Sequence, residues 1–319
     1  MSGDVRLAAF WSAQQVRLTA VLDGLVPPGA RVFYLDYPVS SNVGDLLLYH
    51  GTEAWLSKSG HQVVGRASII DFRFPRLAAD VAILCQGGGN FGDLYRHQRF
   101  REAVVARYPG NRIVFLPQTV HYQSAQAIAE SRRRLSAHDD LHLVLREHRS
   151  LALAEQYFPG CRTYLAPDMA VMLYPITRQY TRSGPGGQLC LFRRDKERPA
   201  EHLPTRGCCT WEGDWKQILG VHYIALRLLQ ALIITAGTLG PTSVTARVWK
   251  AFTWQLVQRS AARFLAADRI ETSRLHGHIF AVLLGVPSRL HDNSYGKNAA
   301  YFRCWHKPMA LADDSLILE

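Results

Sequence analysis

The 319-residue sequence contains no run of about 18 uncharged apolar residues, which is the length that a membrane-spanning helix requires. The nearest approach, residues 218–240, is interrupted by His222 and Arg227, so we expect a buried or amphipathic helix there. The first fifteen residues lack the basic flank, apolar core and cleavage site of a secretory signal. These absences predict a cytoplasmic protein.

The six cysteines form no C-x-x-C pair, so neither a zinc site nor a thioredoxin-like motif is indicated. We expect free, buried thiols in a reducing compartment. A composition of 48% hydrophobic and 20% charged residues excludes intrinsic disorder, collagen and a small disulfide-stapled scaffold. With no metal-ligand cluster in view, we predict neither a metal nor a cofactor.

Acidic residues are in deficit: 37 Lys and Arg stand against 26 Asp and Glu, which gives a net charge of +11. Most of the cations are arginines, whose planar fork suits carboxylates and phosphates. The excess favours an anionic partner, which could be nucleic acid, anionic lipid or a small acidic substrate. Aromatic residues do not alternate with basic ones as in a stacking platform, so we expect no nucleic-acid partner.

Short apolar runs alternate with helical patterns along the chain, which is typical of a parallel sheet covered on both faces. In the first half the predicted strands cover residues 31–39, 80–85, 111–116, 141–146 and 162–166. The second half has predicted strands at residues 188–192, 268–271 and 287–291, with a helix over 276–284 capped by Thr272 or Ser273. A polar, Gly/Pro-rich stretch separates the halves, so we place domains at residues 1–178 and 186–319, joined by a linker at 179–185.

Polar clusters follow several of these strands, where the carboxyl ends of an open sheet form a ligand crevice. SSNVGD (residues 40–45) exposes backbone N–H groups at a helix start, although Ser41 or Asn42 could simply be the N-cap. GGGNFGD (residues 87–93) requires close backbone approach or positive φ angles. It satisfies G-x-G-x-x-G, but the next strand ends in Pro117-Gln118-Thr119 and offers no acid for a ribose, which argues against NAD.

FRRD (residues 192–195) ends a strand with two arginines that point to opposite sides. Arg193 could clamp a carboxylate or phosphate, or simply pair with Asp195. In TSRLHGH (residues 272–278), Arg274 and His276 stand at a helix start, where a bound anion would favour the protonated imidazole. DNSYGK (residues 292–297) repeats the pattern of a strand followed by a polar turn and adds Lys297.

In this order the clusters resemble the polysaccharide pyruvyl transferase family, from about residue 31 to 307. The motifs that carry the resemblance are NVGD, GGGNFGDLY, FLPQT, APD (residues 166–168), FRRD, TSRLHGHIFA and DNSYGK. The first thirty residues and residues 205–254 match no feature of the family.

The resemblance implies an α/β fold with two Rossmann-like domains facing a cleft, as in GT-B glycosyltransferases. It implies transfer of a pyruvyl group from phosphoenolpyruvate to two hydroxyls of one sugar, which forms a cyclic ketal and releases phosphate. It also places the donor against Arg193, Leu275 and His276. We add Arg274 and Lys297 as donor-binding candidates and expect the remaining cleft-loop residues to be Asn42, Gly44, Gly87, Gly88, Gly89, Asn90, Gln118 and Asn293.

For the chemistry we expect His276 to be an acid or a phosphate ligand. Asp45 or Asp93 could take a sugar proton, or could instead hold its own loop by accepting backbone N–H bonds. The acceptor is expected to be a sugar, with a lipid-linked oligosaccharide at the inner face of a membrane as the form that the basic charge favours. The alternatives are a GT-B glycosyltransferase that uses a nucleotide sugar and a non-enzymatic basic binding module.

Overall fold

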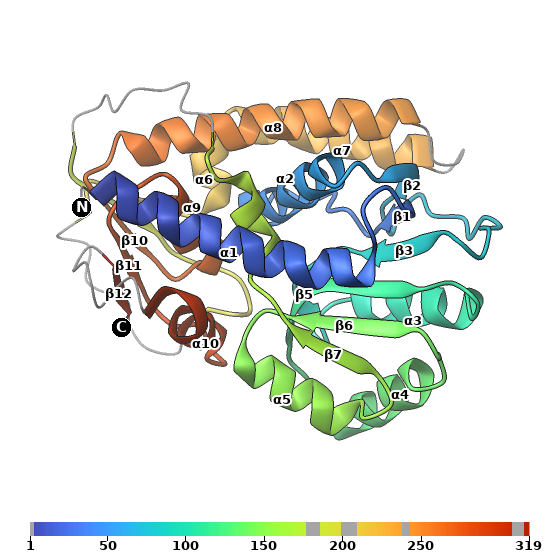
Figure 1. Cartoon of the computed structure of the whole chain (residues 1–319). Coiled ribbons are helices and arrows are strands. Elements are labelled where there is room, and N and C mark those ends of the chain that lie inside the picture. The colour runs from blue at the N-terminus through green and yellow to red at the C-terminus, as the bar shows by residue number, and fades with distance from the viewer. Residues whose placement is uncertain (1–2, 177–185, 199–208, 238–242, 308–315, 319) are drawn as a thin grey trace.

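The computed structural model describes residues 3–176, 186–198, 209–237, 243–307 and 316–318. These residues form two parallel sheets with helices around them (Figure 1). Every strand pairing in both sheets is parallel. The α/β fold class predicted from the alternation of strands and helices is therefore confirmed.

The first sheet has the order β2-β1-β3-β5-β6-β7, with β4 paired to β5 outside this path. Its strands are β1 (Arg31–Leu35), β2 (Gln62–Ala67), β3 (Ala82–Cys85), β4 (Gly88–Phe91), β5 (Ile113–Val120), β6 (Leu141–Leu145) and β7 (Arg162–Leu165). The central strands β3, β5 and β6 are buried along their whole length, as expected for strands covered on both faces.

The second sheet has the order β12-β11-β10-β8-β9. Its strands are β8 (Gln188–Leu191), β9 (Trp211–Gly213), β10 (Arg269–Thr272), β11 (Ser288–Leu290) and β12 (Leu316–Leu318). Because all pairings are parallel, the carboxyl ends of β8, β10 and β11 lie at one edge, and the polar clusters predicted from the sequence follow there.

Helices cover both sheets. In the first half these are α1 (Gly3–Leu25), α2 (Val43–Lys58), α3 (His97–Arg107), α4 (Ala125–Leu135), α5 (His148–Tyr157) and the 3-10 turn η1 (Met169–Leu173). In the second half they are α6 (Trp215–Leu219), α7 (His222–Gly237), α8 (Ser243–Leu265), α9 (Leu275–Leu283), α10 (Lys297–Tyr301) and the π-helical turn η2 (Phe302–His306). One hydrophobic cluster runs from Leu7 to Trp305 and includes side chains from both halves.

The helices α1 and α2 join the two halves of the molecule. α2 is buried on nearly all sides and packs against η1, α8 and α9. α1, in the stretch that resembled nothing, donates from Trp11 Nε1 to the carbonyl of Val282 at 3.4 Å and from Gln15 to the carbonyl of Val171 at 2.9 Å. The N-terminal helix therefore contacts η1, which follows the first sheet, and α9, which packs on the second.

Two details differ from the sequence-based expectations, and a third lies outside the described residues. The residue that caps α9 is Arg274, not Thr272 or Ser273, because the hydroxyl of Thr272 accepts the Arg274 backbone N–H and delays the helix start. Cys190 and Cys209 form a disulfide, so the expectation of free thiols was wrong for this pair. The predicted linker, residues 179–185, lies outside the described residues, and the domain boundaries stay a prediction.

Candidate active site

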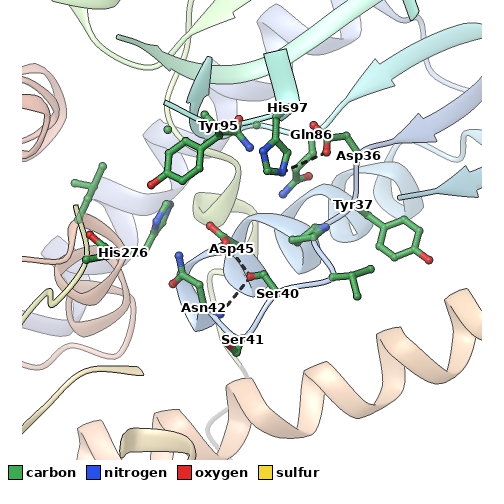
Figure 2. Close-up of a pocket in the computed structure, with 18 of the residues that line it drawn as sticks. Asp36, Tyr37, Ser40, Ser41, Asn42, Asp45, Gln86, Tyr95, His97 and His276 are labelled. Atoms are coloured by element: carbon green, nitrogen blue, oxygen red, sulfur yellow. Dashed lines mark hydrogen bonds and ion pairs between the residues drawn. The ribbon is translucent and has the colours of Figure 1, made fainter. Parts of the chain in front are cut away.

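A pocket of about 410 Å³ lies where loops of the two sheets meet (Figure 2). The first sheet contributes loops that follow β1 and β3 together with Arg146 after β6, and the second contributes residues that follow β8 and β10. The sequence clusters SSNVGD, GGGN, FRRD and SRLH therefore share one pocket. Its volume is within the usual range for small-molecule sites.

Glycines let the loops approach one another at this point. A Cβ added at Gly44 would lie 2.8 Å from the Cβ of His276, so the start of α2 can meet the start of α9 only without a side chain there. A Cβ at Gly89 would lie 3.3 Å from both Arg146 Nη2 and Lys297 Nζ. The glycine loop is thus pressed against two cationic side chains, and Gly88 beside it has a φ of +135°.

Asp168 holds one pair of these donors. Its fully buried carboxylate accepts from Arg146 Nη1 at 2.7 Å and lies 3.2 Å from His276 Nε2. Burial alone would raise the pKa of Asp168, but His276 and Arg146 hold it well below its usual range. Asp168 is therefore an anion that fixes Arg146 and orients the His276 ring, which leaves Nδ1 of that ring on the side of Gly44.

Glu197 holds a second pair. Its buried carboxylate accepts from Arg193 Nη1 at 2.6 Å and is hydrogen-bonded to Lys297 Nζ. Two phenols also donate to it, Tyr95 at 2.7 Å and Tyr295 at 2.9 Å. Burial raises the pKa of Glu197, yet Lys297 and Arg193 outweigh that effect and hold the pKa well below its usual range.

The buried side chain of Lys297 has a pKa that is shifted toward neutral pH. Burial lowers the pKa of Lys297, Arg193 lowers it further and Glu197 opposes both, so that the pKa stands at about 7. The arginines around it keep their charge, because guanidinium groups do not deprotonate in proteins. The cationic character of this side of the pocket therefore depends on pH through Lys297.

Arg146 and Arg193 each retain a donor for a ligand. Arg146 donates from Nε to the hydroxyl of Thr119 and from Nη1 to Asp168. Arg193 pairs through Nε with Asp195 and through Nη1 with Glu197. The remaining Nη2 of both residues has no hydrogen-bond partner within the described part of the chain. Both side chains line the pocket, so these two nitrogens are available to an anion.

Arg274 is more fully committed to the protein. Two of its nitrogens bind the carboxylate of Asp214 at 2.8 and 2.5 Å, and the third lies 3.1 Å from Asp195. Burial lowers the pKa of Arg274, but these carboxylates outweigh it and raise the pKa above the ordinary value. Arg274 lines the pocket as the residue before α9, and with Leu275 and His276 it brings the positive end of that helix to the cavity.

The structure places most of the predicted residues at the pocket. Those that line it are Asn42, Asp45, Gly87, Gly88, Gly89, Asn90, Arg193, Arg274, Leu275, His276 and Lys297. Gly44 adjoins His276, and Asn42 is the N-cap of α2, its side chain accepting from the Gly44 N–H at 3.0 Å. Arg194 projects outward with 56% of its side chain exposed, as expected for the second of two strand-end arginines.

Besides Gly44, three predicted residues do not line the pocket. Asp93 accepts the backbone N–H groups of Gln123 and Ser124 at 2.9 Å each, which is the loop-holding role rather than the proton-accepting one. Gln118 is fully buried and donates to the carbonyl of Gln86 at 2.6 Å. Asn293 accepts the Lys297 N–H at 2.9 Å and so supports that lysine from behind.

The sequence analysis did not single out Arg146, Glu197 or Tyr95, nor assign a role to Asp168. Arg146 ends a predicted strand and Glu197 follows FRRD by two residues, so position alone could have suggested both. It also missed Asp36, a buried residue with a φ of +64° whose carboxylate is 2.7 Å from Arg101 and 3.7 Å from His97. Figure 2 shows Asp36, Gln86 and His97 together on one side of the pocket and His276 on another.

Comparisons with known proteins agree with the motifs. The family model "Polysaccharide pyruvyl transferase" matches residues 42–295. The chain belongs to this family. It is 36% identical to "Putative pyruvyl transferase EpsO" of Bacillus subtilis over 91% of this chain and 89% of that protein. It is 27% identical to "Pyruvyl transferase 1" of Schizosaccharomyces pombe over 91% and 73% of the two chains.

A solved structure with a similar fold comes from an uncharacterised Klebsiella pneumoniae protein. The TM-score is 0.61 at 16% identity, with 96% of this chain and 98% of that chain covered. The likeness shows the fold alone. Within the described ranges no group of three or more His, Cys, Asp or Glu side chains could hold a metal ion, and no helix is both long and apolar enough to cross a bilayer.

Proposed function

We propose that this pyruvyl transferase family member moves the pyruvyl group of phosphoenolpyruvate onto two hydroxyls of one sugar, forming a cyclic ketal in the synthesis of an extracellular polysaccharide. The observation that carries the proposal is the pair of buried carboxylates, Asp168 and Glu197, each of which fixes two nitrogen donors around the Gly89 loop. Family membership supports the transferase class and a sugar or polysaccharide acceptor.

Phosphoenolpyruvate would bind through its carboxylate and phosphate. Arg146 Nη2 and Arg193 Nη2 offer unpartnered N–H donors, and Lys297 and the start of α9 add positive charge. The buried carboxylates keep these donors in place before substrate arrives, so binding requires little rearrangement of side chains. A nucleotide sugar would require a base-and-ribose pocket, and nothing observed at this site favours one.

The reaction itself requires one proton to reach carbon. A sugar hydroxyl oxygen adds to C2 of phosphoenolpyruvate while C3 is protonated, which turns the methylene into a methyl group. The C2–O bond to phosphate then breaks with its electron pair, and the second hydroxyl oxygen closes the ketal on C2. Of the two hydroxyl protons, the balance places one on C3 and the other on the departing phosphate.

His276 is the candidate proton donor to C3. Asp168 holds its Nε2, which directs Nδ1 to the side of Gly44. Asp45 is the candidate acceptor of the first hydroxyl proton, because it lines the pocket and Ser40 binds only its Oδ2, at 2.9 Å. With Asp93 holding a loop outside the pocket, Asp45 is the base that the proposal retains.

The sugar would lie on the side of the pocket that the first sheet provides. Asp36, Gln86, Asn90 and His97 line that side and offer carboxylate, amide and imidazole groups to hydroxyls. Gln86 Nε2 is buried without a hydrogen-bond partner in the described part of the chain, which leaves a donor for an acceptor oxygen. A lipid-linked oligosaccharide is the form of acceptor that the basic charge of the chain favours.

The test measures phosphate release from phosphoenolpyruvate with a panel of nitrophenyl and lipid-linked glycosides. The expected result is acceptor-dependent phosphate release and a product whose mass exceeds the acceptor by pyruvate less one water. Nucleotide sugars form the comparison arm. Sugar transfer from a nucleotide sugar, with phosphoenolpyruvate inert, would overturn the proposal.

A further inference from the structure

The outer face of α7 exposes a continuous row of large apolar side chains. Val221 is 77% exposed, Ile224 65%, Leu228 63% and Leu232 66%. Their spacing places them on one side of the helix, opposite the buried Leu226, Gln230 and Ile233. Six of the ten exposed large hydrophobic residues in the described chain fall between residues 221 and 248, so the exposure is concentrated on this helix pair.

The same stretch contains no acidic residue. Between Asp214 and Asp268 the sequence has no Asp or Glu, but it has six cations: Lys216, Arg227, Arg247, Lys250, Arg259 and Arg263. Lys250 is paired with Glu53 of α2 at 2.6 Å. Arg247 and Arg259 are exposed on α8 and have no carboxylate partner among the described residues.

We propose that the outer face of α7 with the exposed arginines of α8, here called the α7–α8 face, docks on an anionic lipid bilayer. Ile224, Leu228 and Leu232 would enter the boundary between headgroups and acyl chains, with α7 lying in the plane of the membrane. Arg247 and Arg259 would meet lipid phosphates. An apolar row in a stretch of chain whose charges are all positive is complementary to a surface that is apolar inside and negative outside.

A second copy of the chain fits this face less well. In a two-fold dimer the face would meet itself, so its cations would approach cations with no carboxylate of the face to pair with them. The lipid surface supplies both the apolar phase and the opposite charge. The proposal therefore commits to the bilayer, and a dimer is an outcome of the test.

α8, which carries part of the α7–α8 face, reaches the candidate active site with its buried side. Trp215 lines the pocket at the start of α6, which leads directly into α7, and Trp249 Nε1 of α8 donates to the carbonyl of Pro38 on the pocket wall at 3.0 Å. Figure 1 shows α7 and α8 side by side at one edge of the molecule. Docking would bring the pocket to a lipid-linked acceptor, and this consequence rests on the proposed function. The docking itself does not depend on the proposed function.

The experiment measures flotation of the full chain with vesicles of phosphatidylcholine, alone or with about 30% phosphatidylglycerol. Wild type should float with the anionic vesicles. High salt should release the protein from them, because salt screens its electrostatic contacts with the lipid. Leu228→Gln with Leu232→Gln should weaken binding about tenfold or more per leucine. The matched control, Val5→Gln with Val16→Gln on α1, changes two exposed apolar side chains outside the face and should bind like wild type.

A second pair of variants tests the charge. Arg247→Gln with Arg259→Gln should weaken binding about fivefold per arginine, whereas Arg132→Gln with Arg133→Gln on α4 should not. Equal flotation of the leucine variant and its control would overturn the proposal, as would a wild-type dimer that the leucine variant converts to monomer without vesicle binding. Phosphate release with a water-soluble glycoside should be unchanged in the leucine variant, which separates a failure of docking from a failure of the proposed function.

Discussion

Asp168 and Glu197 are buried carboxylates that each hold two nitrogen donors, but the donors come from different regions of the chain. Asp168 joins Arg146, which follows a strand of the first sheet, to His276, which starts a helix of the second. Glu197 takes both its cations, Arg193 and Lys297, from the second half, and only Tyr95 reaches it from the first. The first cluster therefore ties the halves together, and the second organises one wall of the pocket.

The clusters also differ in how their arginines are paired: Arg193 pairs with Asp195 as well as Glu197, whereas Asp168 is the one carboxylate partner of Arg146 among the described residues. Arg146 cannot release its proton, so Asp168 always faces a buried cation. Lys297, whose pKa burial lowers to about 7, can discharge. The comparison teaches that loss of Asp168 would leave a buried guanidinium without a carboxylate, whereas loss of Glu197 would leave Arg193 paired with Asp195 and Lys297 able to release its proton.

Removing each carboxylate should break this comparison most strongly. Asp168→Asn should lower the free energy of unfolding by about 3–5 kcal/mol, because Arg146 is left charged and buried. Glu197→Gln should cost only about 1–3 kcal/mol, because Lys297 can give up its proton and Arg193 keeps Asp195. Chemical denaturation of the two variants measures the difference, and equal losses would contradict the inference that the cations of Glu197 are better compensated than Arg146.

Replacing the imidazole tests the chemistry rather than the packing. His276→Ala should reduce turnover by about 10²–10⁴-fold, the usual worth of a positioned acid, with little change in melting temperature. His276→Gln should restore much of the rate only if the ring binds phosphate instead of donating a proton. Lost stability with unchanged turnover per folded molecule would show that His276 is a structural residue.

A pair of aspartates sharpens the assignment of the base. Asp45→Asn should reduce turnover on the order of a hundredfold, because Asp45 lines the pocket. Asp93→Asn is the matched control: it removes an acceptor of the Gln123 and Ser124 N–H groups, so it should lower stability by about 1 kcal/mol and leave turnover near wild type. Equal rates for the two variants would remove Asp45 from the mechanism.

The smallest effect concerns pH. Lys297 is charged below its pKa of about 7 and neutral above it, so the KM for phosphoenolpyruvate should rise several-fold as the pH increases through that value. Lys297→Met should bind the donor weakly at low pH and show a flatter profile, because no charge remains to be lost. A profile of the same shape in wild type and Lys297→Met would assign the pH dependence to another group.

The sequence predicted well those features that depend on neighbouring residues. The buried runs that became β3, β5 and β6, the glycine loop and the helix start at His276 all follow from local pattern. The strand-end pair predicted that at most one arginine faces the crevice, and the family resemblance selected Arg193; Arg193 lines the pocket and Arg194 points out.

What the sequence could not show are contacts between distant residues. Asp168 is 108 residues from His276, and Glu197 is 102 residues from Tyr95 and 100 from Lys297, so no local spacing reveals either cluster. Asp93 and Asp45 are alike as sequence signals, each in a glycine-containing loop after a strand, and only the fold separates pocket from loop support. The Cys190–Cys209 pair likewise has no spacing signal.

The central claim is that the donors fixed by Asp168 and Glu197 form a phosphoenolpyruvate site, and calorimetric titration of phosphoenolpyruvate into four proteins tests it most directly. Wild type and Arg194→Ala should bind alike, because Arg194 is exposed and does not line the pocket. Arg193→Ala should weaken binding by about 2–5 kcal/mol, and Arg193→Lys, which keeps the charge but loses the fork, should also weaken it. Equal affinities for the Arg193 and Arg194 variants would contradict the account.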